Sequence, residues 1–362
     1  MRAVVIDDSG FMRRAVERML AEDPEIEVVG RGRNGLEAIE LAKTLEPDVM
    51  TLDIEMPEMD GLTALRRIMR EAPCKVVMVS SLTTEGSVAA LRALRLGAAD
   101  VVAKDHSTFS IHIDNIRDEL VGKVKGLAQE AKRTRAIAKP AAAGATAGTT
   151  AAAAHDGPAA REVNFTNQRF DLICIGSSTG GPPVLERVLP TIPAGFSTPI
   201  VIAQHMPEVF TQSMSRRLNE LCPLEVRHGA DGDEPAPGTI TICPGGKHTH
   251  VKHVATGRHR LHVTDEPAAD VFKPSASVLF ESAAKACNGP VLGVVLTGIG
   301  EDGKRGAQAI RDAGGTVLSQ SADTCVVYGM PRAVDEAGLS HASVTPEGLG
   351  RAVASLARAA AA

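Results

Sequence analysis

The sequence has very few aromatic residues. None of its 362 residues is tryptophan, one is tyrosine and eight are phenylalanine, so aromatics make up 2% of the chain. Aliphatic side chains must therefore form most of any hydrophobic core. The sequence also lacks an apolar run of 18 residues, and its first residues lead directly into a strand-like segment rather than a signal peptide. We therefore expect a cytoplasmic protein without membrane insertion.

An excess of basic charge and a pattern of paired cysteines are also missing. The formal net charge is −5, which argues against a nucleic-acid partner. The six cysteines are scattered, and several lie inside apolar runs, which favours buried free thiols over disulfides or a zinc site. An apolar content of 44% with 23% charged residues is typical of a soluble globular protein, and the length allows two domains.

Residues 1–123 alternate between short apolar runs and segments of helical length. The apolar runs cover 3–6, 26–29, 49–52, 76–79 and 101–103. The last helical segment begins at Ile113 and places Ile116, Leu120, Val124 and Leu127 on one face. Five such units predict a (βα)5 domain with a parallel sheet covered on both faces.

The alternation stops over residues 124–168, where Ala, Gly and Thr dominate, and we expect a flexible linker there. It resumes at Asp171, so 169–362 forms a second domain. Strands are expected at 172–175, 200–203, 239–243, 291–296 and 316–318, with helices at 183–189, 209–221, 275–286 and 303–313. The turn-rich stretch 226–264 predicts a β-hairpin inserted into a doubly wound, mainly parallel α/β fold.

Polar side chains end four strands of the first predicted sheet. Asp7 and Asp8 follow the first strand, Asp53 ends the third, Ser80 the fourth and Lys104 the fifth. Ligands bind beyond the carboxyl ends of parallel strands, and carboxylates there can hold Mg²⁺. One carboxylate could then become an aspartyl phosphate, with hydroxyl and ammonium groups meeting the phosphate. The alternative is that Asp8 or Ser9 only caps a helix.

The blocks Val5-Ile-Asp-Asp-Ser9, 48–61 and 76–81, together with Lys104, resemble the receiver domain of bacterial response regulators. The resemblance implies that Asp53 is the phosphoacceptor. It implies that Mg²⁺ is bound by Asp53, by Asp7 or Asp8, and by the carbonyl of Glu55, and that Ser80 and Lys104 sense the phosphate. Two positions depart from the family. Asp105 stands where a proline is usual, and Val101 stands where an aromatic switch residue is usual.

The second domain opens with a strand that breaks into Gly176-Ser-Ser-Thr-Gly-Gly181 before a helix. The spacing of Gly176, Ser178 and Gly180 is that of a nucleophile elbow, although a phosphate-binding or purely structural glycine turn is an alternative. His205 and Asp302 follow two other buried strands by a few residues, so a Ser–His–Asp arrangement is expected at one sheet edge.

Other residues compete for parts of this arrangement. Glu301 and Asp265 are rival acids for Asp302. The histidines of the hairpin stretch have strand-like spacing and no accompanying cysteine cluster, which favours solvated side chains over a metal site; they are His248, His250, His253, His259 and His262.

The segments 175–182, 204–207, 236–238, 244–248, 273–280 and 296–303 resemble the chemotaxis methylesterase CheB family. The resemblance implies Ser178 as nucleophile, His205 as base and Asp302 as its orienting acid, with oxyanion donors around Thr179 and Ile299. The family commonly has Met at Ile299, Ala at Lys304 and an Asn-Arg-His-Arg-Pro-type segment at 270–274. An inward Lys304 ammonium would weaken the contact between Asp302 and His205.

The resemblance implies a phosphorylation-activated serine esterase. It would hydrolyse glutamate γ-methyl esters on methyl-accepting chemoreceptors, and deamidate receptor glutamines. A chemotaxis histidine kinase would donate the phosphoryl group, Mg²⁺ would serve only the receiver, and we expect a monomer. The alternatives are a receiver-controlled serine hydrolase acting on another acyl substrate, and a non-catalytic, phosphorylation-regulated interaction module.

Overall fold

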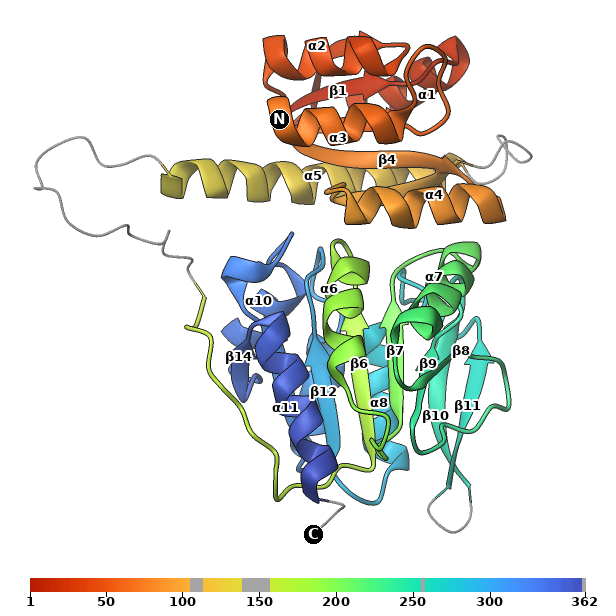
Figure 1. Cartoon of the computed structure of the whole chain (residues 1–362), viewed down its shortest axis with the longest axis vertical. Helices are drawn as coiled ribbons and strands as arrows, with labels where there is room; N and C mark the ends of the chain where they lie inside the picture. Colours follow the sequence, from red (N-terminus) through yellow and green to blue (C-terminus); the bar gives the residue numbers. More distant parts are fainter. Residues whose placement is uncertain (105–112, 139–156, 255–257, 360–362) are drawn as a thin grey trace, which may run out of the picture. The chain divides into compact units, whose positions relative to one another are not determined.

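Figure 1 shows the computed structural model of the chain, which describes residues 1–104, 113–138, 157–254 and 258–359. The chain divides into two compact units. The first consists of Met1–Ser81 and Arg92–Gly157, and the second consists of Leu82–Leu91 and Pro158–Ala362. Two parallel sheets and one separate hairpin organise the fold.

The first sheet has five parallel strands in the order β2-β1-β3-β4-β5. Its strands are β1 (Arg2–Ile6), β2 (Glu27–Gly32), β3 (Val49–Asp53), β4 (Lys75–Ser81) and β5 (Asp100–Lys104). The intervening helices are α1 (Gly10–Ala21), α2 (Gly35–Leu45), α3 (Gly61–Glu71) and α4 (Thr84–Arg95), followed by α5 (Ile113–Ala138). The central strands are buried along nearly their whole length because helices cover both faces. This confirms the predicted (βα)5 architecture.

The helix α5 extends beyond the predicted domain boundary at residue 123. Val124, Leu127 and Ala128 are buried along it, continuing the apolar face that begins further upstream. The first part of the expected linker, 124–138, is therefore helical, because the apolar spacing of three and four residues persists there. Residues 139–156, which carry most of the Ala, Gly and Thr, lie outside the described residues.

The second sheet has seven strands, all parallel, in the order β14-β13-β12-β6-β7-β9-β8. Its strands are β6 (Leu172–Ser177), β7 (Ile200–Gln204), β8 (Glu225–His228), β9 (Thr239–Ile242), β12 (Val291–Val295), β13 (Thr316–Gln320) and β14 (Ala342–Val344). The edge strands β8 and β14 were not predicted, because β8 has a single apolar residue, Val226, and β14 is only three residues long. The predicted parallel α/β fold is confirmed.

Helices cover both faces of this second sheet. In Figure 1, α6 (Gly181–Val188), α7 (Glu208–Leu221) and α11 (Pro346–Ala359) lie in front of it and α8 (Ala276–Ala286) lies behind. The remaining helices are α9 (Lys304–Asp312) and α10 (Met330–Glu336), with short 3₁₀ turns η1 (Leu189–Thr191) and η2 (Ala322–Thr324). The core is mainly aliphatic, as the scarcity of aromatics predicts.

The predicted hairpin is present as the antiparallel pair β10 (His248–Val254) and β11 (Arg258–Thr264). It forms a separate two-stranded sheet, and Val251 and Leu261 bury its inner face in the core. All six cysteines are free. Among the described residues, no helix is both long and apolar enough to cross a membrane.

Candidate active site and phosphorylation site

Ser178 lies at the turn between β6 and α6. Ser177 and Gln204 are the last paired residues of the adjacent strands β6 and β7, so Ser178 and His205 are the first residues beyond that pair. The Gly181 N–H donates to the Ser178 carbonyl over 2.8 Å, which closes the turn. Gly180 has φ +80°, a conformation that favours glycine. The side chain of Ser178 thus leaves the sheet edge on a sharp strand-to-helix turn.

Two buried polar side chains hold this turn from either side. Gln204 accepts a hydrogen bond from the Ser177 hydroxyl, and its Nε2 donates to the Ser178 carbonyl over 3.0 Å. Thr297, at the end of the neighbouring strand β12, donates through its hydroxyl to the Thr179 carbonyl over 3.0 Å. Both side chains are almost fully buried, so breaking either contact would leave polar groups without water to replace it.

His205 contacts Asp302, which lies in the loop between β12 and α9. The distance between His205 Nε2 and Asp302 Oδ2 is 2.8 Å, and the two side chains are only 7% and 9% exposed. The Nδ1 atom of His205 is buried and has no hydrogen-bond partner among the described residues. The contact with Asp302 therefore engages Nε2, and Nδ1 is the ring nitrogen without a partner.

The N-terminus of α8 binds the carboxylate of Asp302. Oδ1 accepts from the Ser275 hydroxyl and from the N–H groups of Ser277 and Gly303, each over 2.9 Å. Oδ2 accepts from the Ala276 N–H over 2.6 Å. Burial alone would raise the pKa of Asp302, but the hydrogen bond and charge of His205 and the hydrogen bonds from Ser277 hold it well below its usual value. The carboxylate is therefore ionised throughout the neutral range.

The rival acids do not contact His205. The side chains of Glu301 and Asp265 are 74% and 70% exposed. Lys304 also points away from the pair, because its Nζ lies 3.4 Å from Glu301 Oε2. The ammonium that would weaken the contact between Asp302 and His205 is thus paired elsewhere.

The loop after β12 approaches the serine closely. A Cβ atom placed on Gly298 would lie 2.7 Å from the Cβ atom of Ser178, so only glycine fits there. Ile299 follows directly, and its N–H donates no hydrogen bond among the described residues. An oxyanion-binding role for this amide stays a prediction. Thr179 is almost fully buried in the serine turn itself.

Four of the five hairpin histidines form two cross-strand pairs, and His248 lies opposite Thr264. His250 faces His262 and His253 faces His259, with ring centroids 6.3 and 6.2 Å apart. Within the described ranges, the one group of three potential metal ligands is found in the first sheet instead.

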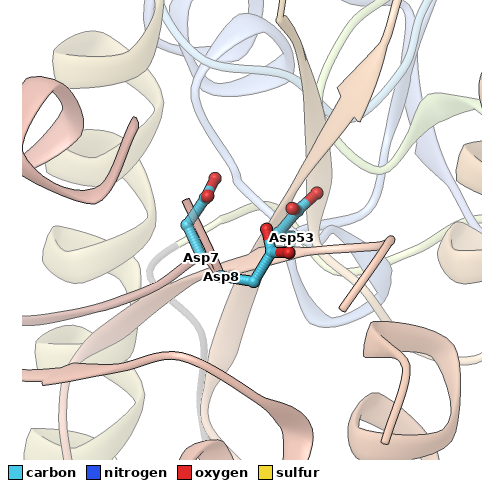
Figure 2. Close-up of side chains that lie close together, drawn as sticks. All are labelled: Asp7, Asp8 and Asp53. Atoms are coloured by element: carbon cyan, nitrogen blue, oxygen red, sulfur yellow. The ribbon is translucent and has the colours of Figure 1, made fainter. Parts of the chain in front are cut away.

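That group consists of Asp7, Asp8 and Asp53, whose ligand oxygens all lie within 4.8 Å of one another (Figure 2). The helix cap at α1 is supplied by Ser9, which accepts from the Met12 N–H, so Asp8 is not needed for capping. Lys104 reaches the same place from β5, with its Nζ 2.6 Å from Asp53 Oδ1 and 4.0 Å from Asp7 Oδ2.

The electrostatics of this cluster fit a bound cation. Burial, together with the charge of Asp53, raises the pKa of Asp7 to about 6. Burial also raises the pKa of Asp53, although the hydrogen bond from Lys104 opposes this. The Oδ2 atoms of Asp7 and Asp53 are buried and have no hydrogen-bond partner among the described residues. Unpaired buried carboxylate oxygens are the ligands that a divalent cation such as Mg²⁺ prefers.

The remaining predicted receiver residues lie at the same edge. Ser80 is almost fully buried in β4, next to the end of β3. Glu55 is exposed, and its side chain is not part of the acidic cluster. Val101 is buried, and its carbonyl accepts from Lys123 Nζ over 2.7 Å. Asp105 lies outside the described residues.

Comparison with known proteins identifies both halves of the chain. Residues 173–353 match the CheB methylesterase family and residues 3–113 match the response regulator receiver domain. A protein-glutamate methylesterase/protein-glutamine glutaminase of Oleidesulfovibrio alaskensis is 45% identical, and the match covers 98% of each chain. A second, from Nitratidesulfovibrio vulgaris, is 44% identical over 97% of each. The chain belongs to the CheB family of protein-glutamate methylesterases and protein-glutamine glutaminases.

A solved structure agrees with the assignment of the second domain. The CheB methylesterase catalytic domain of Thermotoga maritima is 34% identical and superimposes with a TM-score of 0.50, covering 52% of this chain and 98% of that one. The chain therefore combines a receiver domain with a CheB-type catalytic domain.

Sequence reasoning missed the residues that support the CheB-type site. Gln204 and Ser275 lie within segments that resemble the family, but the sequence did not indicate which groups their side chains contact. The sequence marks 270–274 as a departure from the family, but nothing in it indicated that the ring of Phe272 stacks on His205. A buried polar residue at a strand end, such as Thr297, is the one local signal that could have been used.

Proposed function

We propose that this CheB-family chain hydrolyses γ-glutamyl methyl esters on chemoreceptors to glutamate and methanol, with Ser178, His205 and Asp302 as its catalytic residues. The contact between His205 and Asp302 carries the proposal, because it fixes the protonated nitrogen at Nε2 and leaves Nδ1 for Ser178. The same chemistry applies to receptor glutamines, where ammonia is released instead of methanol.

In the first half of the reaction, Ser178 Oγ attacks the ester carbonyl carbon while its proton passes to His205 Nδ1. The backbone N–H groups of Thr179 and Ile299 hold the oxyanion, and each such donor is typically worth about 3–4 kcal/mol. The C–O bond to the methoxy group then breaks, and the proton on His205 leaves with it as methanol. Asp302 stays ionised and stabilises the imidazolium in between.

In the second half, a water molecule replaces methanol beside His205. His205 Nδ1 removes a proton from this water as its oxygen attacks the acyl carbon. The bond to Ser178 Oγ breaks and Oγ regains the proton from His205, which releases the glutamate side chain. The buried position of the His–Asp pair supports this role, since charge interactions are stronger away from water.

Control by the receiver is the second part of the proposal. Asp53 attacks a phosphoryl group from a chemotaxis histidine kinase and becomes an aspartyl phosphate. Asp53, Asp7 or Asp8, and the Glu55 carbonyl would hold Mg²⁺, which would supply charge neutralisation for this transfer. Lys104 and Ser80 then contact the phosphoryl oxygens. Because kinase and receptor methylation sites face the cytoplasm, the protein is proposed to act there.

Methylated receptor membranes test this proposal directly. Wild-type protein should release methanol, Ser178→Ala should not, and phosphoryl donor with Mg²⁺ should accelerate release by wild type but not by Asp53→Ala. Covalent labelling of Ser178 without methanol release would favour another acyl substrate. The absence of both labelling and methanol release would favour a non-catalytic interaction module. Equal rates for wild type and Asp53→Ala with donor present would refute receiver control.

A further inference from the structure

An aromatic ring covers one face of the proposed base. The rings of His205 and Phe272 are stacked, with centroids 4.6 Å apart and planes inclined by only 2°. Phe272 lies in the loop between β11 and α8, at the segment where the chain departs from the Asn-Arg-His-Arg-Pro-type sequence of its family. Its side chain is 44% exposed and that of Val271 is 85% exposed, so neither belongs to the core.

The loop itself is held in place independently of this stack. Arg305 of α9 binds Asp270 over 2.9 and 3.2 Å and also pairs with Glu281. On the other side, the Lys273 Nζ atom donates to the Asp265 carbonyl over 2.8 Å. The Lys273 carbonyl accepts a hydrogen bond from the Gly246 N–H over 3.1 Å. The chain on both sides of Phe272 is therefore anchored by contacts that do not involve His205.

We propose that Phe272 is a positioning residue for His205, which keeps the imidazole plane fixed and stabilises its protonated form. An aromatic face attracts a cation, and His205 is a cation only while it carries the proton of Ser178. The contact is thus stronger in the transition state than in the ground state, which is the condition for raising kcat. This role rests on the proposed esterase function.

The charged groups around His205 do not provide this stabilisation from the same side. Asp302 is the one charged residue in hydrogen-bond or ion-pair contact with His205 among the described residues. On the packed elements, Lys304 pairs with Glu301, Asp270 with Arg305, and Lys273 with the Asp265 backbone. Asp302 meets the imidazole at its Nε2 edge, whereas Phe272 meets its face.

The test compares Phe272→Leu, Phe272→Tyr and the neighbouring Val271→Ala in the full chain. With methylated receptors, Phe272→Leu should lower kcat about 2- to 10-fold with KM nearly unchanged. The acidic limb of its pH profile should move to lower pH, because the imidazolium has lost a stabilising contact. Phe272→Tyr should restore both values, and Val271→Ala should leave them within twofold. Equal kcat and pH limb for wild type and Phe272→Leu, or no rescue by tyrosine, would overturn the inference.

A second measurement separates this inference from the esterase activity. NMR titration of His205 in Ser178→Ala, with and without Phe272→Leu, needs no turnover. We expect the pKa of His205 to fall when leucine replaces Phe272, and an unchanged pKa would refute the role. If wild type releases no methanol while the His205 pKa still falls, the proposed substrate is wrong and the positioning role stands. Thermal unfolding of each variant shows that it is folded.

Discussion

Replacing Asp302 with asparagine would test the His–Asp contact most directly. Asparagine keeps one carbonyl oxygen and turns the other position into an NH₂ donor. At the Oδ1 position that donor would oppose the Ser277 and Gly303 N–H groups, whereas at Oδ2 it would oppose the Ala276 N–H alone. The second orientation is less unfavourable. It places the amide hydrogens against His205 Nε2.

This orientation reverses the tautomer of His205. Since Nε2 then accepts, the ring proton must move to Nδ1, which can no longer take the proton of Ser178. The equivalent substitution in the Ser–His–Asp triad of serine proteases lowers kcat about 10⁴-fold, and we expect a similar loss here, about 5 kcal/mol. One opposed pair of donors should also cost about 1–3 kcal/mol of stability, or roughly 2–10 °C in Tm.

Methanol release from methylated receptors measures the first effect and thermal unfolding the second. Glu301→Gln is the matched control, because Glu301 precedes Asp302 in the same loop and is 74% exposed, and it should stay within twofold of wild type. If folded Asp302→Asn kept more than a tenth of the wild-type kcat, the role given to Asp302 would be wrong.

Three further predictions concern other parts of the structure. Burial raises the pKa of Asp7 to about 6, so the Asp7 carboxyl loses its proton at a lower pH in the unfolded protein than in the folded protein. Without divalent cations, the free energy of unfolding should therefore fall by about 2–3 kcal/mol as the pH rises from about 4 to about 6. Asp7→Asn should flatten this dependence in urea unfolding with chelator, and an unchanged slope would contradict it. Gly180→Ala would place its Cβ atom 2.5 Å from the Val326 side chain at φ +80°, so we expect a loss of about 2–4 kcal/mol in thermal unfolding. Gly338→Ala has a similar φ of +66° but open space around its Cβ atom, and should lose only about 1 kcal/mol. Equal losses would argue against the Val326 contact. Gln204→Leu should leave the Ser177 hydroxyl without an acceptor and remove one of the two hydrogen bonds to the Ser178 carbonyl, whose bond from the Gly181 N–H remains. This should cost about 1–3 kcal/mol in denaturant unfolding and slow Ser178 labelling more than tenfold, and normal labelling would show that Gln204 does not hold the turn.

The main strands and the ends of those strands could be predicted from the sequence. Buried parallel strands read as continuous apolar runs, and such runs predicted every strand of the first sheet and five of the seven strands of the second. The polar residues that follow them had to meet at one edge, because parallel strands end on the same side. This is why Asp7, Asp53 and Lys104 could be grouped, as could Ser178 and His205, without a structure.

The partners of those residues depended on the tertiary structure. Asp302 meets a serine 27 residues before it and a histidine 97 residues before it, and no local pattern distinguishes it from Glu301 beside it. The path of the loop after β12 determines which of the two acids contacts His205. It turns Asp302 toward the N–H groups of α8 and leaves Glu301 and Lys304 exposed to solvent. Phe272 reached His205 in the same way, through a loop whose position is set by Arg305 on another helix. Periodicity along the chain is a local property that the sequence carries by itself, whereas the contact of two loop side chains depends on how distant strands and helices pack.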